Sequence, residues 1–320
     1  MRPRLAHPRL LGTHLALVAT LGAALFSAAG CDIGRITVGT TAQVLKRGQP
    51  ALQQESDYEM ARMAIPGALK TVETFWVVKP DDENLIGILT EGYCQYGTAF
   101  VEDDWEVAQF AKKIDDIEYH DARATKIFTR CLNYALLSLG DRWKKDIFGT
   151  PEVTNKLVAD TGADDRTPLM WAALALGSLV NHNLRRPDAL GEVPLVHQMV
   201  DRVIALDAAH PPSDPQLAAL PHIALGMLYS AASAQFGGDD KKAQAEFEIA
   251  LKLTGDKMLL ARTLMGYRVG KMRNDEKFFH AQLVKVLETP PSVWPEQRLA
   301  NEVAHRRARR YLTHEKEMFQ

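Results

Sequence analysis

The sequence predicts an all-α protein, and three observations support this fold class. Apolar residues recur at helical spacing along most of the chain, and helix breakers divide it into segments of helical length. Strand patterns are nearly absent, because β-branched residues alternate clearly only in residues 35–38. Roughly a dozen helices joined by short connections indicate a fold in which helices pack directly on helices.

Individual helices can be located from their apolar stripes and their ends. A helix is predicted over residues 122–139, where apolar residues follow at steps of one, three or four: Ala124, Phe128, Cys131, Leu132, Ala135 and Leu139. Asp214 before Pro215, and Thr167 before Pro168, have the residue types typical of an N-cap and a first helical position. Pro66 and Pro80 are among the residues expected to separate helices.

Two segments carry the pattern of a helical repeat. Residues 225–229 (Leu-Gly-Met-Leu-Tyr) match the first helix of a tetratricopeptide unit, and Ala243, Phe247 and Ala250 match its second helix. A second Leu-Gly pair, at residues 176–177, repeats the first-helix pattern; generic core packing explains the apolar residues but not this repetition. The sequence therefore predicts an irregular tetratricopeptide-like solenoid in which the second helix covers Gly226.

The N-terminus has the pattern of a bacterial lipoprotein export signal. Three arginines precede an uncharged apolar run over residues 15–26, which is too short to span a bilayer. Ala28, Ala29 and Gly30 then precede Cys31, in an arrangement that resembles the lipobox in which the cysteine becomes lipidated. Ordinary cleavage after Ala29 is the alternative. We expect a lipoprotein signal peptide over residues 1–30, a tether over 31–50 and a tetratricopeptide-like domain over 51–320.

Composition excludes several classes of protein. The chain has 320 residues, 46% of them hydrophobic, with 38 basic and 40 acidic residues, which suits a folded globular protein. Without the three arginines of the signal segment, 35 basic residues face 40 acidic ones, so nucleic acid is not an expected partner. Besides Cys31 there are two cysteines, Cys94 and Cys131, which could pair in an oxidising compartment. Because both lie in helical segments, we expect two separate core cysteines rather than a disulfide.

No catalytic motif is found, and the sequence predicts neither enzymatic activity nor a metal or cofactor site. The chain has no Walker A loop, no His-Glu-x-x-His zinc motif and no Gly-x-Ser-x-Gly nucleophile elbow. Paired carboxylates such as Asp103 and Asp104 are interpreted as helix N-caps and first-turn charges. His182, at a helix end, is expected to cap the helix, with a ligand contact as the alternative. The basic run of Arg306, Arg307, Arg309 and Arg310 is interpreted as complementing the helix dipole, with lipid headgroups as the alternative.

One aromatic stripe could take part in ligand binding. Tyr93, Tyr96 and Phe100 are spaced by three and four residues, which places them on one face of a helix. They fit a helix–helix core, or alternatively the wall of a ligand cleft, because apolar pockets are often lined by aromatic side chains. These three residues are the candidate ligand contacts.

The second half of the chain resembles a known family. Residues 225–229, 236–243 and 247–251, together with the ending at residues 298–308 and the segment 278–283, resemble the T component of tripartite ATP-independent periplasmic (TRAP) transporters, the TatT family. Residues 92–102 and 122–139 fit the first repeat of that family, so the resemblance covers most of residues 80–315.

The resemblance implies a lipid-anchored periplasmic protein, a trimer, that partners the solute-binding protein (P component) of a TRAP system. It also implies a role in passing a small organic ligand, which can be hydrophobic, through a cleft or pore. A generic tetratricopeptide-like scaffold lipoprotein for envelope assembly is the alternative function.

Overall fold

The computed structural model describes residues 33–232, 235 and 237–319, and these residues form helices, turns and loops without any strand. The signal peptide and Cys31 lie outside the described residues. None of the helices in the described part of the chain is long and apolar enough to cross a bilayer. The helices are α2 (Ile33–Gly48), α3 (Pro50–Gln53), α4 (Tyr58–Val78), α5 (Glu83–Tyr96), α6 (Glu102–Phe110), α7 (Ile114–Leu139), α8 (Asp141–Asp146), α9 (Pro151–Ala159), α10 (Arg166–Asn181), α11 (Pro187–Leu190), α12 (Val193–Ala209), α13 (Pro215–Tyr229), α14 (Asp240–Leu253), α15 (Leu259–Arg273), α16 (Glu276–Glu288), α17 (Arg298–Thr313) and α18 (Glu315–Met318), with a π-helical segment η1 (Gly97–Val101) and 3₁₀ turns η3 (Pro291–Val293) and η4 (Pro295–Gln297).

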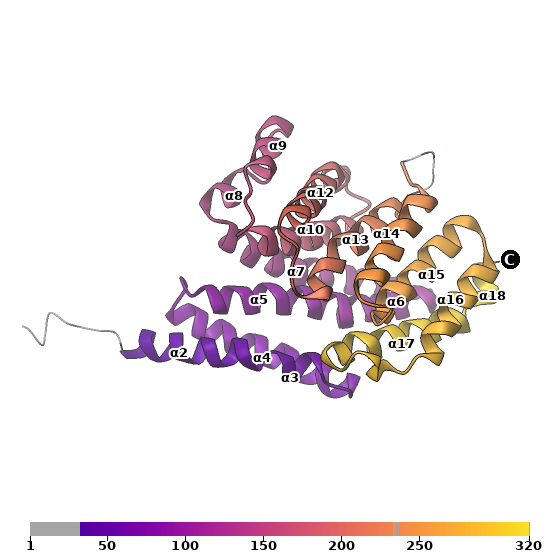
Figure 1. Cartoon of the computed structure of the whole chain (residues 1–320), viewed down its shortest axis with the longest axis horizontal. Helices are drawn as coiled ribbons and strands as arrows, with labels where there is room; N and C mark the ends of the chain where they lie inside the picture. The colour runs from indigo at the N-terminus through magenta and orange to yellow at the C-terminus, as the bar shows by residue number, and fades with distance from the viewer. Residues whose placement is uncertain (1–32, 233–234, 236, 320) are drawn as a thin grey trace, which may run out of the picture.

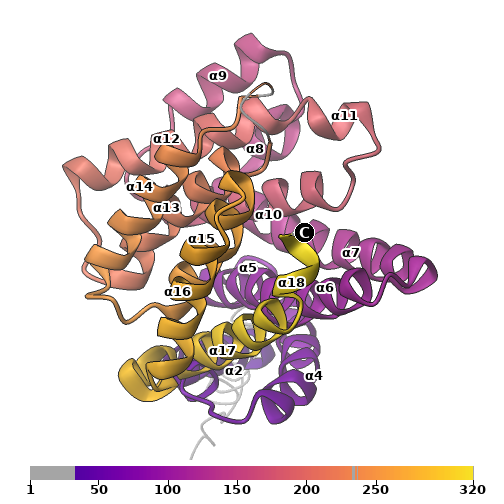
Figure 2. The ribbon, with the colours of Figure 1, turned by 90° about the vertical axis from the view of Figure 1, so that its right-hand side faces the viewer.

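Helices that follow one another in the chain pack side by side. From α4 the contacts run through α5, α7, α10, α12, α13, α14, α15 and α16 to α17. The last long helix then returns to the beginning of the fold, because α17 also contacts α3 and α4 (Figures 1 and 2). The row of helices is therefore closed by contacts between its two ends.

Apolar stripes build the core as predicted. All six residues of the stripe on α7, from Ala124 to Leu139, are buried. Many helices begin with an aspartate whose carboxylate accepts backbone N–H groups of the first turn, which satisfies donors that the helix itself leaves unpaired. Asp214 caps α13 in this way, as predicted, and Asp82 and Asp239 cap α5 and α14.

Two local predictions about helix limits are wrong, those at Thr167 and at Pro66. Helix α10 begins at Arg166 with Asp165 as its N-cap residue, so Thr167 lies within its first turn. Residues 35–38, which alternate like a strand, lie inside helix α2, where Val38 and Ala42 are buried against the neighbouring helices α4 and α5. Pro66 lies inside α4 and does not end it, because Leu69 and Val72 on one side of the proline and Ala61 on the other are all buried. Packing of both halves of α4 therefore outweighs the hydrogen bond that proline removes.

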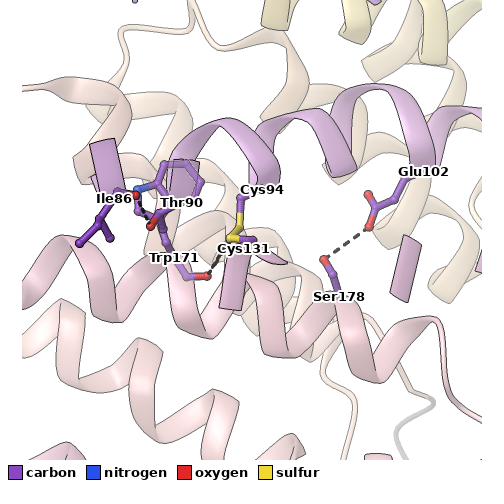
Figure 3. Close-up of a disulfide and its surroundings, with 7 residues drawn as sticks. All are labelled: Ile86, Thr90, Cys94, Glu102, Cys131, Trp171 and Ser178. Atoms are coloured by element: carbon purple, nitrogen blue, oxygen red, sulfur yellow. Dashed lines mark hydrogen bonds between the residues drawn. A yellow bond between two sulfur atoms is a disulfide. The ribbon is translucent and has the colours of Figure 1, made fainter. Parts of the chain in front are cut away.

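The prediction of two separate core cysteines is also wrong. Cys94 on α5 and Cys131 on α7 form a disulfide with a Cα–Cα distance of 5.3 Å (Figure 3). Both residues are buried, and the carbonyl oxygen of Trp171 on α10 lies 3.7 Å from Cys94 Sγ. The sequence placed each cysteine on a helix, but the pairing depends on which faces of α5 and α7 meet.

The close contact predicted at Gly226 is confirmed. Gly226 on α13 and Phe247 on α14 are both buried, and a Cβ atom at position 226 would lie 2.8 Å from Phe247 Cε2. Real Cβ atoms do not come this close to a ring, so glycine is needed for the approach of the two helices.

Candidate functional site: a charged cluster between helices α6 and α17

The aromatic stripe lies in the interior. Tyr93, Tyr96 and Phe100 are buried in the main core, where the Phe100 ring lies 5.0 Å from that of Tyr58. The Tyr93 hydroxyl donates to Glu73 Oε1 at 2.6 Å, and the Tyr96 hydroxyl accepts from Arg123 Nη2 at the same distance. The rings are thus placed as a helix–helix core would place them, and their role as ligand contacts stays a prediction.

A π-helical segment leads from this stripe into a charged cluster. In η1 the backbone N–H of Glu102 donates to the carbonyl of Gly97, five residues earlier, which is π-helical geometry. Such segments are frequent at functional sites. The Thr98 carbonyl in the same segment accepts a 2.7 Å hydrogen bond from Arg307 Nη2 on α17. The π-helical segment is therefore bonded directly to α17.

The cluster consists of three acidic residues of α6 (Glu102, Asp103, Glu106) and three arginines of α17 (Arg306, Arg307, Arg310). The Asp103 side chain is 0% exposed and accepts from Arg306 Nε and from Arg310 Nη1, each at 2.7 Å. Arg310 also donates to Glu106, and Arg307 lies 3.7 Å from Glu102. Each buried charge thus faces at least one opposite charge, as burial of ions requires.

Tyrosine hydroxyls complete the hydrogen bonding of these carboxylates. Tyr58 on α4 donates to Asp103 Oδ2 at 3.0 Å, and Tyr311 on α17 donates to Glu106 Oε1 at 2.9 Å. The Arg306 guanidinium also lies 4.6 Å from the centre of the Tyr58 ring, in cation–π geometry. Helix α4 is thereby tied to both α6 and α17.

Neighbouring positive charges lower the pKa values of two acids of the cluster, Asp103 and Glu102. Burial raises the pKa of Asp103, but the nearby positive charge of Arg310 and the hydrogen bond from Arg306 outweigh it, so the pKa is lowered overall. The pKa of Glu102 is likewise lowered, because hydrogen bonding and charge from His182 exceed the effect of burial. Glu102 and Asp103 are therefore held in their ionised form.

His182 belongs to the edge of this cluster. It is the C-cap residue of α10, as predicted, and its backbone N–H donates to the Ser178 carbonyl. Its ring is 0% exposed and faces two carboxylates: Nδ1 lies 2.9 Å from Asp121 Oδ1, and Nε2 lies 3.5 Å from Glu102 Oε1. Burial lowers the pKa of His182, yet the two carboxylates more than compensate and raise it. Ser178 on the same helix also donates to Glu102, at 3.4 Å (Figure 3).

The prediction for the basic run was incomplete. Arg306, Arg307 and Arg310 do not simply complement the dipole of α17, because they pair with the acids of α6. Asp103 and Asp104 lie in the first turn of α6, as predicted, but they do not cap it, because α6 continues directly from η1. A signal was present in the sequence: the acids at 102, 103 and 106 have the same spacing as the arginines at 306, 307 and 310. Two helix faces with matching spacing can meet charge for charge.

Two open pockets lie outside the cluster. One, of about 230 Å³, lies beside Asp104 and is lined also by Arg62, Lys113 and His120. The other, of about 250 Å³, lies where α2, α3, α5, α10 and α13 meet and is lined by Lys46, Gln49, Gln53, Glu91, Thr167, Trp171 and Asp214, among others. In the described parts of the chain, no three His, Cys, Asp or Glu side chains are grouped so as to hold a metal ion.

Comparison with known proteins identifies the family. The sequence model of the TRAP transporter T-component family (TAtT) matches residues 54–319, which is most of the chain and includes both partners of the charged cluster. A search of curated proteins gave no match. The chain therefore belongs to the T-component family of TRAP transporters.

Proposed function

We propose that the mature protein is a periplasmic, lipid-anchored accessory protein of a TRAP-type transporter, which partners the solute-binding protein of that system. The observation that carries the proposal is the family match over residues 54–319. Membership links the chain to a TRAP system, and a solute-binding protein is the soluble periplasmic element with which an anchored accessory protein could associate.

The sequence and the disulfide support a location outside the cytoplasm. Cys31 follows the small residues 27–30 that end the signal segment, and acylation there would hold the protein on a membrane. The bond between Cys94 and Cys131 is also of a kind that persists in oxidising compartments such as the periplasm.

We further propose that the protein helps to pass a small organic ligand and assembles as a trimer of tetratricopeptide-like subunits. The Gly226–Phe247 contact supports a tetratricopeptide-like pairing of α13 and α14. The 250 Å³ pocket is a candidate ligand position, because Trp171 supplies an aromatic surface and Gln49, Gln53 and Glu91 supply hydrogen-bonding groups. Glu91 lies on α5, the helix that also carries Tyr93 and Tyr96.

The test is purification of the tagged full-length lipoprotein from its native membranes, followed by mass spectrometry of bound proteins and small molecules. We expect a TRAP solute-binding protein to co-purify, and light scattering to give the mass of a trimer. Recovery of a monomer with no affinity for any co-encoded solute-binding protein would contradict the proposal. Envelope-assembly proteins in place of the solute-binding protein would favour the scaffold alternative.

A further inference from the structure

The first turns of helix α2 carry apolar side chains that nothing in the described chain covers. Ile33 and Ile36 are 77% and 59% exposed, although they lie on the same helix as the buried residues Val38 and Ala42. The buried pair fixes α2 against α4 and α5, so the helix cannot rotate to hide its exposed isoleucines. This end of α2 therefore presents an apolar surface outward.

The C-terminal end of α4 lies beside α2 and also carries exposed aliphatic side chains. Val77 and Val78 are 71% and 46% exposed, and they directly precede the loop that meets α2. In that loop, Asp81 accepts from Arg35 Nη2 at 2.5 Å, and Lys79 lies against Gly39 of α2. We call the set of Ile33, Ile36, Val77 and Val78 the anchor edge; it lies where the described chain begins (Figure 1).

The position of Cys31 constrains what can face this edge. Only two peptide links separate Cys31 from Ile33, and an extended chain spans at most ~3.6 Å per residue. Lipidation of Cys31 would thus hold the start of α2 within about 7 Å of Cys31. This distance is similar to the ~5–10 Å to which interfacial helices enter the headgroup layer. Residues 33–48, within the segment expected to be a tether, are helical and contact α4 and α5.

We propose that the anchor edge rests in the headgroup layer of the periplasmic membrane leaflet, so that the folded domain is seated on the bilayer in one fixed orientation rather than held away from it. The inference rests on the lipid anchor of the proposed function. Aliphatic side chains at this depth remove apolar surface from water, as in interfacial helices.

A membrane explains the edge better than a second copy of the chain. Four aliphatic side chains cover much less than the ~800 Å² that each partner contributes to a stable protein interface. The charged groups at this edge are Arg35, Lys79, Asp81, Asp82 and Glu83. Arg35 pairs with Asp81 and Lys79 pairs with Asp82, so there is no excess of positive charge to attract anionic lipid. Contact of the anchor edge with the membrane should therefore depend on apolar burial and be insensitive to salt concentration.

The experiment uses the full-length protein with the lipid on Cys31 verified by mass spectrometry. A single cysteine is introduced by Ile36→Cys and, as the matched control, by Leu253→Cys at the exposed end of α14, which lies away from α2 in both views (Figures 1 and 2). Because Cys94 and Cys131 are joined, an environment-sensitive dye labels only the introduced thiol under non-reducing conditions. The labelled proteins are placed in phosphatidylethanolamine–phosphatidylglycerol vesicles that contain lipids with a quencher near the headgroup.

We expect the dye at position 36 to be blue-shifted and quenched several-fold more than the dye at position 253, and equally so at high salt. Equal, weak quenching at both positions on lipidated protein would overturn the inference and leave the anchor intact. An unmodified Cys31 would overturn both the inference and the lipid anchor of the proposed function. A blue shift at position 36 that appears without vesicles and grows with protein concentration would assign the edge to a second copy, and would also overturn the inference.

Discussion

Asp103 and Arg306 are separated by 203 positions in the chain, yet Arg306 Nε lies 2.7 Å from Asp103 Oδ2, and the carboxylate is fully buried. This ion pair joins α6, near the beginning of the fold, to α17, near its end. Because Arg310 and Tyr58 bond the same carboxylate, Asp103 is the centre of the contact that closes the row of helices.

We expect Asp103→Asn to lower the free energy of unfolding by about 3 kcal/mol, the low end for a broken buried ion pair, because it removes the buried counter-ion shared by the mostly buried Arg310 and the partly exposed Arg306. Chemical denaturation measures the change. The control is Asp116→Asn, in an exposed pair 3.8 Å from Lys113, which should change stability by less than about 1 kcal/mol. Equal effects of the two substitutions would show that the closure contributes nothing to stability.

The environment of His182 predicts a loss of stability on the alkaline side. Its folded pKa is raised by Glu102 and Asp121, so the stabilisation is fully present below about pH 6.5, the usual unfolded pKa, and is lost as pH rises through the folded pKa. The slope is at most about 1.4 kcal/mol per pH unit for one proton. Glu102 and Asp103 have lowered pKa values, so their contribution is lost in a separate window, as pH falls below about 4.

Thermal or denaturant unfolding between pH 5.5 and pH 9 tests this expectation. His182→Asn should remove the alkaline decline, whatever its effect on overall stability, whereas the exposed control His210→Asn should keep it. A decline of the same slope in the His182 variant would assign the titration to another group.

Removal of the disulfide should destabilise the protein. The double substitution Cys94→Ala and Cys131→Ala opens a link between residues 37 positions apart, and chain-entropy arguments give a loss of about 3–4 kcal/mol. Reductant should lower the unfolding midpoint of the natural protein and leave that of the double variant unchanged. Two alkylatable thiols in the unreduced, denatured natural protein would show that the pair is not bonded.

Gly226 offers a matched test of helix packing. Gly226→Leu should cost about 1–3 kcal/mol or more, because even a Cβ atom there would meet the Phe247 ring at 2.8 Å. In contrast, Gly87→Ala on α5 should stabilise by about 0.5–1 kcal/mol, since a Cβ at position 87 meets nothing within 4 Å and alanine favours the helix. A melting temperature of Gly226→Leu within a degree of the natural protein would mean that α13 and α14 do not approach there.

Tyr96 separates packing from ligand contact. Tyr96→Ala should cost about 3–5 kcal/mol, because it empties a buried ring position, whereas Tyr96→Phe keeps the ring and removes only the hydrogen bond with Arg123. Ligand uptake and unfolding are measured on the same samples. Weakened uptake by a stably folded Tyr96→Phe protein would support a ligand contact, and unchanged uptake would leave Tyr96 as a core residue.

The sequence by itself determined the properties that depend on neighbours in the chain. The helical class follows from apolar periodicity, the cap at Asp214 from local hydrogen bonding, and the close approach at Gly226 from a short repeat motif. The family resemblance was also carried by contiguous segments, and the match over residues 54–319 confirms it.

Tertiary structure alone decided which distant faces meet. The Cys94–Cys131 bond, the continuity of α4 through Pro66 and the burial of His182 all depend on helix rotation and packing, which a periodic pattern does not specify. The pairing of Asp103 with Arg306 is of the same kind, because two charged runs with matching spacing have partners only when the chain brings α17 back onto α6. Local propensity sets the helices, while burial and charge pairing across the fold select their arrangement.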